Sequence, residues 1–358
     1  MLFRHSSRSV TLAAWAEDPA GLEHVHADER DVVRVLCKKT TDGGLDEEGR
    51  VRRLVFSESD LTGEEIAHIQ TLSKLLSLTF NKGSVTDETL ASLRKLRPLE
   101  YLKVVDPRIT DAGLAHLANL DIVAYLVLSD TAVTGSGLKH LNEVRCAGLW
   151  LDRTPLTDEG LATLKGNNQL HRLSLRKTKL TDASVAHIAS FKWLQVLDLS
   201  ATEMKGDGMT RLWNLKKLLE LDLDETPITD DALQGIDRCD SLSIIRLKDT
   251  AITDKALQHI AAHPGLVELD LRNTQITDAG LMRLQTLKTL ETLWLTVDGE
   301  RITPKGVRAL ETALLGSSDF GGNGKTSSKL INPHQGVGYG SRISNPGDNV
   351  FQQNKKSE

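Results

Sequence analysis

The sequence is poor in cysteine, in aromatic residues and in long apolar runs, and each shortage argues against a class of protein. Three cysteines are spread over 358 residues, at Cys37, Cys146 and Cys239. No CxxC pair is present to begin a zinc or redox motif, so we expect all three to be buried as small hydrophobic residues. No apolar run approaches the ~20 residues that cross a bilayer. Aromatic residues make up only 4% of the chain, which indicates a core of aliphatic side chains.

An excess of basic charge is also missing. The formal net charge is −5 and the isoelectric point is near 6.1, whereas a nucleic-acid-binding protein usually presents a clustered basic face. We therefore expect neither a nucleic-acid partner nor a membrane partner. No HExxH, GxSxG or paired-glycine cofactor motif occurs, so the sequence predicts a protein without catalytic residues, cofactor or metal.

What the sequence does contain is a repeat of about 24 residues. The string Ile-Thr-Asp marks it, and the threonine position falls at Thr62, Thr86, Thr110, Thr134, Thr157, Thr181, Lys205, Thr229, Thr253, Thr277 and Thr303. The steps are 24, 24, 24, 23, 24, 24, 24, 24, 24 and 26 residues, which gives eleven units. A period of this length is typical of solenoids, in which each unit packs only on its neighbours.

The unit at residues 266–287 changes its hydrophobic period half-way. Leu269 and Leu271 alternate with polar residues, which predicts a half-buried strand. A stripe at every third residue follows, formed by Leu281, Leu284 and Leu287. This stripe predicts a short helix or 3₁₀ segment. Thr277 precedes the segment, where a hydroxyl can cap free backbone amides, and Thr62 and Glu65 have the spacing of a capping box.

A second threonine position lies three residues after the second strand leucine. It holds Thr131, Thr154, Thr178, Thr202, Thr226, Thr250 and Thr274. We interpret these residues as a buried ladder whose hydroxyls satisfy backbone groups where the chain leaves each strand. A hydroxyl-lined ligand track is the alternative, and it would require side chains that point away from the core.

The pattern LxxLxLxxTxITDxGLxxL resembles the leucine-rich-repeat family. It is most similar to the cysteine-containing subtype of F-box proteins and to the 24-residue threonine-bearing repeats of bacterial proteins, and it covers about residues 51–315. The resemblance implies an α/β fold, a right-handed solenoid with a parallel concave β-sheet and short helices on the convex side. It also implies a binding role rather than catalysis.

A non-catalytic scaffold that binds a partner protein on its concave face is therefore the leading hypothesis, and we expect a monomer. In F-box proteins such repeats recruit substrates to a ubiquitin ligase, but no F-box is recognisable in residues 1–50. A substrate-recognition subunit of a ligase-type complex thus stays an alternative, as does a carbohydrate-binding or enzymatic protein.

The flanks of the repeat array differ from it in composition. Residues 1–16 are a leader in which two arginines precede a short apolar stretch ending in Ala14-Trp15-Ala16. The end of this stretch has the shape of a signal-peptide cleavage site, but the apolar stretch itself is short for a signal peptide. We therefore expect a cytoplasmic protein, and secretion is the alternative. Residues 316–358 are rich in Gly, Ser and Asn, which predicts a disordered tail. Residues 321–326 within it have only the ending of a phosphate-binding loop.

Residues 17–50 are predicted to cap the array with a helix around residues 19–28 and a β-hairpin. The apolar stretch at residues 32–36 is strand-like, while Asp42-Gly43-Gly44 and Glu48-Gly49 have the composition of turns. Residues 51–56 are predicted as the first repeat strand. At the other end, Pro304 is expected to open a last helix that runs to about Leu315.

An apolar group forms the first candidate binding site. Its members occupy outward positions of three consecutive predicted strands: Tyr101, Val105, Tyr125, Val127 and Trp150. Three of the eight Tyr and Trp residues of the chain therefore fall together, and exposed aromatic residues are enriched at interaction hot spots. The alternative is that a cap loop or the tail covers them.

An acidic group forms the second candidate site, at Asp198, Glu220, Asp222 and Asp224. Asp198 and Asp222 should be cross-strand neighbours about 4.8 Å apart. Docking of a basic segment is the functional interpretation, and charge balance with nearby arginine and lysine residues is the structural one. A histidine column weighed as a metal site comprises His68, His116, His140, His187 and His259. It falls on the outer helices, where we expect it to face water.

Overall fold

A computed structural model describes residues 8–10, 19–57, 60–96, 99–120, 122–165, 169–315 and 331–332. These residues form two compact units, a first that ends at Leu170 and a second that begins at His171. The predicted leader lies outside the described residues apart from residues 8–10. The predicted tail, with its phosphate-loop-like string, lies outside them apart from residues 331–332.

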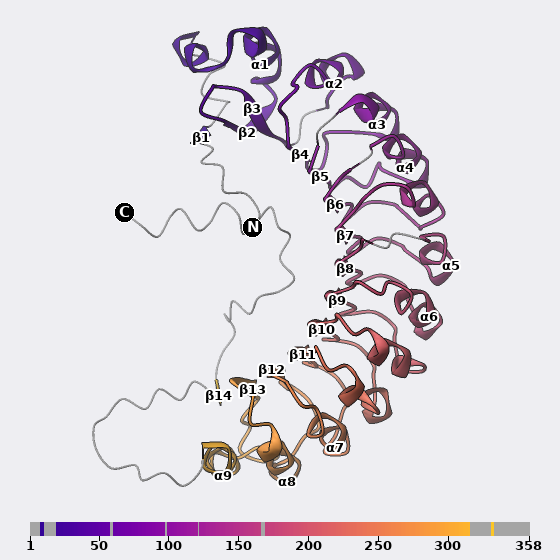
Figure 1. Cartoon of the computed structure of the whole chain (residues 1–358), viewed down its shortest axis with the longest axis vertical. Coiled ribbons are helices and arrows are strands. Elements are labelled where there is room, and N and C mark those ends of the chain that lie inside the picture. The colour runs from indigo at the N-terminus through magenta and orange to yellow at the C-terminus, as the bar shows by residue number, and fades with distance from the viewer. Residues whose placement is uncertain are drawn as a thin grey trace, which may run out of the picture. The chain divides into compact units, whose positions relative to one another are not determined.

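The first unit is a sheet whose later strands alternate with short helices (Figure 1). Its elements are β1 (Arg8–Val10), the 3₁₀ helices η2 (Pro19–His24) and η3 (Ala27–Glu29), α1 (Arg30–Leu36), β2 (Thr40–Leu45), β3 (Val51–Phe56), α2 (Gly63–Ile69), β4 (Ser77–Phe80), α3 (Asp87–Leu90), η4 (Ala91–Lys95), β5 (Tyr101–Val104), α4 (Asp111–Leu117), β6 (Tyr125–Val127), η5 (Leu138–Leu141), β7 (Gly148–Trp150) and α5 (Asp158–Leu161). Strands β1, β2 and β3 pair antiparallel, and β3 to β7 pair parallel.

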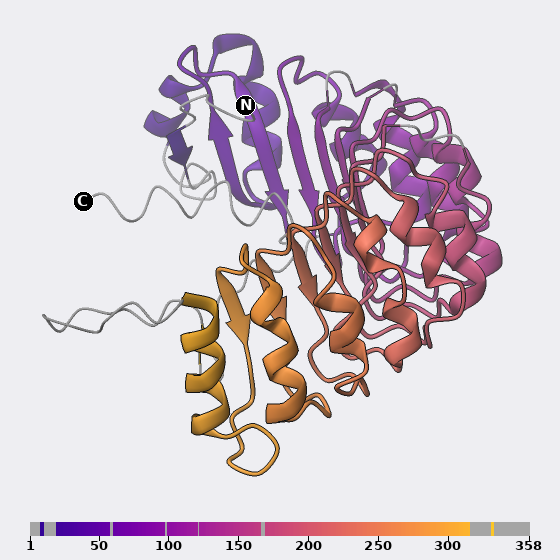
Figure 2. The ribbon, with the colours of Figure 1, turned by 60° about the horizontal axis from the view of Figure 1, so that its bottom comes forward.

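The second unit has the same alternation and parallel pairing throughout. Its elements are β8 (Arg172–Ser174), η6 (Asp182–Ser184), α6 (Val185–Ile188), β9 (Val196–Asp198), η7 (Met209–Asn214), β10 (Glu220–Asp222), η8 (Asp230–Leu233), η9 (Ile236–Arg238), β11 (Ile244–Arg246), α7 (Ala256–Ile260), β12 (Glu268–Asp270), α8 (Asp278–Leu281), η10 (Met282–Thr286), β13 (Thr292–Trp294), α9 (Pro304–Leu315) and β14 (Ile331–Asn332). Figure 2 shows these strands side by side, with α9 in yellow near the C-terminal end of the unit.

The core of each unit lies between the sheet and the helices. In the repeat used for prediction, Leu269 and Leu271 are buried on the strand side, and Leu281 and Leu284 are buried on the helix side. The predicted switch from period two to period three is therefore confirmed, as are the first repeat strand and the last helix. The three cysteines are buried and free, as expected.

Threonine side chains cap several of the helices, but Thr277, the residue that the sequence analysis named, makes no side-chain cap to α8. Thr62 and Glu65 form the complete capping box at the start of α2, with the Thr62 amide donating to Glu65 Oε2 at 2.8 Å. Later helices use the same position: the Thr157 hydroxyl accepts from the Gly160 amide at 3.1 Å, and the Thr303 hydroxyl accepts from the Gly306 amide at 3.0 Å. The caps satisfy amides that helices this short leave free.

The predicted threonine ladder is also confirmed. All seven residues are buried, and each hydroxyl donates to the carbonyl oxygen of the residue three positions earlier at 2.5 to 2.8 Å. The residue just before each of them has a positive φ: Asp130, Arg153, Lys177, Ala201, Glu225, Asp249 and Asn273. At the end of each of these strands the chain thus has one residue in the left-handed region. The threonine that follows it donates its hydroxyl hydrogen to a carbonyl oxygen that the turn leaves free.

Three predictions in the N-terminal cap are wrong. The strand-like stretch at residues 32–36 lies within helix α1, because Val32, Val33 and Leu36 have i, i+1, i+4 spacing and bury one face. The Asp42-Gly43-Gly44 turn signal lies inside strand β2, which pairs with β3, so the hairpin turns after Leu45, where Gly49 has a φ of 78°. The helix expected around residues 19–28 is two short 3₁₀ helices instead.

Candidate functional site

The strand register brings the apolar candidates of the first unit together as predicted. Tyr101 in β5 lies opposite Tyr125 in β6, and Val127 in β6 lies opposite Trp150 in β7. The Tyr125 and Trp150 rings have their centroids 6.1 Å apart and are tilted by 49°. Val105 follows β5 directly and continues the same outward side of the sheet.

These side chains are not the exposed patch that the sequence predicted. The exposed fractions are 7% for Tyr101, 9% for Tyr125, 1% for Val127 and 1% for Trp150, and Val105 alone is half-buried. The expectation of solvent-exposed aromatic residues on this face is therefore wrong, although the register behind it is right.

Gly148 accounts for part of the burial of Trp150. A Cβ atom at Gly148 would lie 2.6 Å from the Cη2 and Cζ3 atoms of the Trp150 ring and 3.0 Å from Cδ1 of Tyr125. The indole therefore lies back over the glycine of its own strand, in space that any side chain would fill. Its Nε1 is buried and has no hydrogen-bond partner within the described structure.

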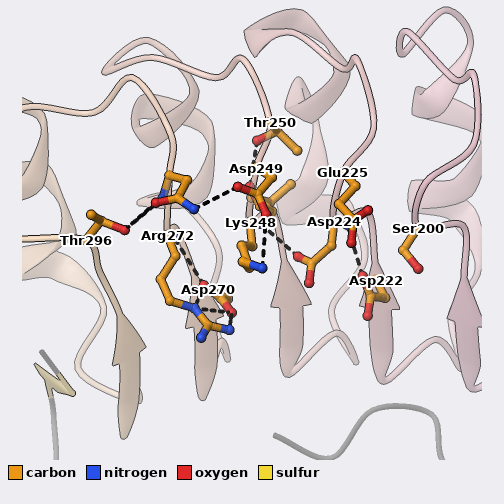
Figure 3. Close-up of polar contacts among 12 residues, drawn as sticks. Ser200, Asp222, Asp224, Glu225, Lys248, Asp249, Thr250, Asp270, Arg272 and Thr296 are labelled. Atoms are coloured by element: carbon orange, nitrogen blue, oxygen red, sulfur yellow. Dashed lines mark hydrogen bonds and ion pairs between the residues drawn. The ribbon is translucent and has the colours of Figure 1, made fainter. Parts of the chain in front are cut away.

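The acidic candidates of the second unit lie side by side on the sheet face. Asp198 pairs in register with Asp222, which confirms that they are cross-strand neighbours. Both are nearly buried, at 6% and 3% exposure. Asp198 Oδ1 accepts from the amide of Ser200 at 2.8 Å, and Asp222 Oδ1 accepts from the amide of Asp224 at 3.0 Å. Figure 3 shows Asp222 at the end of β10 and Asp224 just beyond it.

Burial and repulsion from neighbouring carboxylates raise the pKa of two of these carboxyls above its ordinary value. Burial, followed by the charges of Asp198 and Asp224, raises the pKa of Asp222 to about 8. Burial and the charge of Asp270 raise the pKa of Asp224 to about 6, although its Oδ1 accepts a hydrogen bond from the Lys248 amide at 2.7 Å. Asp222 is thus largely protonated at neutral pH.

Glu220 is paired with a buried arginine, Arg246. Arg246 is 5% exposed and forms ion pairs with Glu220 and, at 3.3 Å, with Glu268 on the strand to its other side. Burial by itself would lower the pKa of Arg246, but Glu220, Asp222 and Glu268 raise it above its ordinary value. Charge balance across strands, the structural interpretation of the acidic group, therefore applies to Glu220.

The charged face continues beyond the predicted residues. Arg272 forms an ion pair with Asp270 and lies over the Trp294 ring, 5.2 Å from its centroid. Figure 3 shows this pair one strand along from Lys248 and Asp249, whose ion pair is 3.0 Å long. The sequence carries the signal for Lys248, Asp270 and Arg272, since they fill the outward positions of Asp222 and Asp224 one or two repeats later.

Known proteins share the repeat fold of this chain. Residues 264–284 match a family model described as a leucine-rich repeat. The chain is similar in structure to an internalin (inlF) from Listeria monocytogenes, with 18% sequence identity and a TM-score of 0.53, and the match covers 88% of this chain and 99% of that one. It is also similar to TLR13 in a TLR13–ssRNA13 complex, with 17% identity, a TM-score of 0.51, and coverage of 69% and 39%. Among curated proteins, none matches the sequence.

The chain is built of leucine-rich repeats. At these identities the likeness to the two solved structures concerns the fold. The fold class predicted from the repeat pattern is accordingly confirmed, with a mostly parallel open sheet and short helices.

Among the described residues, no group of three or more His, Cys, Asp or Glu side chains could hold a metal ion. The histidine column is half-buried at His68, His116, His140 and His259 and exposed at His187. No helix of the described chain has the length and apolarity to cross a bilayer.

Proposed function

We propose that the protein is a non-catalytic scaffold that binds a partner protein on the strand-bearing, concave face of its leucine-rich repeats. One comparison between repeats within the second unit carries the proposal. The inward strand positions are uniformly aliphatic and buried: Leu173, Leu197, Leu221, Ile245, Leu269 and Leu293. The outward positions that follow them differ in size and charge: Ser174, Asp198, Asp222, Arg246, Asp270 and Trp294. Core packing requires the inward positions to be uniformly aliphatic, whereas nothing in the fold requires the outward positions to vary.

The form of the face favours a macromolecule over a small metabolite. Strands at a spacing of about 4.8 Å present their outward side chains as a broad sheet. Ion pairs hold several of these side chains in place, as Arg246 is held between Glu220 and Glu268. Fixed charges of both signs favour a complementary protein surface, where they contribute selectivity and association rate.

The half-buried and exposed residues of this face are the proposed contacts. In the second unit they include Glu220, Asp224, Glu225, Lys248 and Arg272. Asp198 and Asp222 are more deeply buried residues of the same face. In the first unit, Val105 is the accessible member of the apolar group, and Tyr101, Tyr125, Val127 and Trp150 shape the surface from below.

Site-directed photo-crosslinking tests the proposal. A benzophenone amino acid placed at Glu225, on the strand side, should capture one defined protein from an extract of the source cells. The same probe at Lys255, an exposed residue at the start of α7, should not capture it. Capture of that protein from Lys255 alone, or equally from both positions, would contradict binding on the concave face.

A charge reversal supplies the second arm of the test. Lys248→Glu with Arg272→Glu should weaken capture about tenfold or more, because the partner would then face repulsion in place of attraction. Lys255→Glu with Lys305→Glu is the matched control, since both lysines are exposed at helix starts. Equal capture by the two double variants would show that the strand-side charges do not take part.

A further inference from the structure

Two large apolar side chains of the second unit are left open to water. Trp193 is 51% exposed and Leu219 is 43% exposed, and they are the only exposed large hydrophobic residues within residues 171–314. Each lies in the loop that leads into a strand, β9 for Trp193 and β10 for Leu219. The same loops supply fully buried residues to the core, Leu194 and Leu218, so the fold does not need the two exposed side chains for packing.

The two loops are neighbours at the edge where the parallel strands begin. The carbonyl oxygen of Gln195, two residues after Trp193, accepts from the Leu219 amide at 2.8 Å and from the Glu220 amide at 3.0 Å. Trp193 and Lys217 are 24 residues apart and occupy equivalent positions in successive repeats. Trp193, Lys217 and Leu219 therefore belong to one edge of the second unit.

The charge in these two loops has one sign. Residues 189–195 and 213–219 contain three lysines, Lys192, Lys216 and Lys217, and no Asp or Glu. All three lysines are exposed. Lys216 lies 3.7 Å from Asp240 of the next loop, but both side chains are more than half exposed, and an ion pair in water neutralises little. The lysines thus present net positive charge around the two apolar side chains.

The later loops of the same edge lack this combination. Residues 237–243 carry two aspartates beside one arginine, and residues 261–267 have no lysine or arginine. None of the described residues in these loops or in residues 285–291 is an exposed large hydrophobic side chain. Exposed apolar side chains and unbalanced lysines occur together only in the two adjoining loops of this edge, within the described part of the second unit.

We propose that Trp193, Leu219, Lys192, Lys216 and Lys217 form a second docking site, the basic edge, for an acidic protein segment that carries a large apolar side chain. A half-exposed tryptophan is the kind of residue that supplies an interface with its main anchor. The lysines select a segment of negative charge and repel a basic one. This site lies on the loops before the strands, and it adjoins the proposed concave-face contact Glu220, which directly follows Leu219.

Selection from a phage library of short random peptides tests the proposal without knowledge of the natural partner. The full-length protein is the bait, and a variant with Trp193→Ser and Leu219→Ser is the counter-bait. Peptides that bind the wild type but not the variant should be acidic and carry a large apolar residue. Lys192→Glu, Lys216→Glu and Lys217→Glu together should weaken those peptides about tenfold or more, and high salt should weaken them too. Lys255→Glu with Lys305→Glu should leave them unchanged.

Three results would overturn the proposal. One is a selection that yields no peptide sensitive to the Trp193 and Leu219 changes. Another is a set of sensitive peptides that are neutral or basic. The third is binding to phosphatidylcholine vesicles that contain phosphatidylserine, lost in the Trp193 and Leu219 variant, without any acidic peptide; this would assign the edge to an anionic membrane. Because every changed residue is exposed, unaltered melting temperatures should accompany each variant.

Discussion

The carboxylate of Asp111 accepts hydrogen bonds from both the backbone amide and the hydroxyl of Thr134, one repeat further along the chain. It also accepts from the amides of Gly135 at 3.0 Å and Gly137 at 2.8 Å. The same pair of bonds links other successive repeats: Asp87 to Thr110, Asp230 to Thr253, Asp254 to Thr277 and Asp278 to Thr303. The aspartate that follows the repeat's threonine therefore joins each of these five repeats to the next one.

Asp111→Asn should destabilise the protein by about 2–3 kcal/mol, because an amide side chain offers one neutral acceptor oxygen to donors that now share a carboxylate. Chemical denaturation measures the change. Asp207→Asn is the control: Asp207 is exposed in a turn, and its replacement should cost under about 0.5 kcal/mol. A loss of similar size at both positions would show that Asp111 does not act as a link between repeats.

The Asp111 contribution should also depend on pH. Burial by itself would raise the pKa of Asp111, but the hydrogen bonds from Thr134, Gly137 and Gly135 outweigh it and lower the pKa below its ordinary value. The contribution is therefore complete above the unfolded-state pKa of about 3.9 and is lost as the pH falls through the lower folded-state pKa. The stability difference between wild type and Asp111→Asn should shrink in this acid range. A difference that stays constant there would contradict the assignment.

The threonine ladder predicts a cost at buried positions alone. Thr202→Val keeps the shape of the side chain but leaves the Leu199 carbonyl oxygen without the hydroxyl that now donates to it at 2.7 Å. We expect a loss of about 1–3 kcal/mol in the free energy of unfolding. Thr210→Val, at an exposed position of η7, should cost under about 0.5 kcal/mol. Equal losses would mean that the ladder hydroxyls contribute nothing specific.

Replacement by alanine should lower the stability of the protein far more at one tryptophan, Trp150, than at another, Trp193. Trp150→Ala should cost about 3–5 kcal/mol, since its ring is 1% exposed and packs over Gly148. Trp193→Ala should cost under about 0.5 kcal/mol, since half of that side chain is already in water. Thermal melting compares them. If Trp150→Ala melts like wild type, the ring is not part of the core, and the exposed-patch interpretation returns.

The repeat fold was predictable from the sequence because its determinants are local. Alternation places Leu269 and Leu271 inward whatever the neighbours are, and the 24-residue period then fixes which strands pair. The buried ladder was predictable for the same reason, because Thr202 and its equivalents recur at one position of the repeat. Helix α1 was missed because Val32 and Val33 favour strands locally, while their burial with Leu36 favours the helix.

The accessibility of the site was not predictable on the same basis. The register correctly placed Trp150 on the outward side, but its burial depends on a glycine two residues earlier and on a tyrosine in another strand. The ionisation of Asp222 likewise depends on carboxyls from its own strand end and from the adjacent strand. Side-chain orientation and burial across repeats decide both properties, and neither is a feature of a single repeat.

The raised pKa of Asp222 gives the last prediction, a stability that falls as the pH rises. Between the unfolded-state pKa of about 3.9 and the folded-state pKa of about 8, the unfolded chain is ionised at this carboxyl while the folded chain holds the proton. Folding then takes up a proton, so each rise in pH through this window favours the unfolded state. The penalty stays at its full size above the folded-state pKa.

Asp222→Asn should remove that penalty. Its amide oxygen can still accept the hydrogen bond from the Asp224 backbone amide, and it carries no charge beside Asp198. The variant should be more stable than wild type at pH 8 by at least about 1 kcal/mol, with no difference near pH 4, where both side chains are neutral in the folded state. Denaturation across this pH range, with Asp207→Asn as the control, measures the difference. A variant that is less stable than wild type at pH 8 would mean that an ionised Asp222 stabilises the face, and the acidic group would then be a paired rather than a repelling cluster.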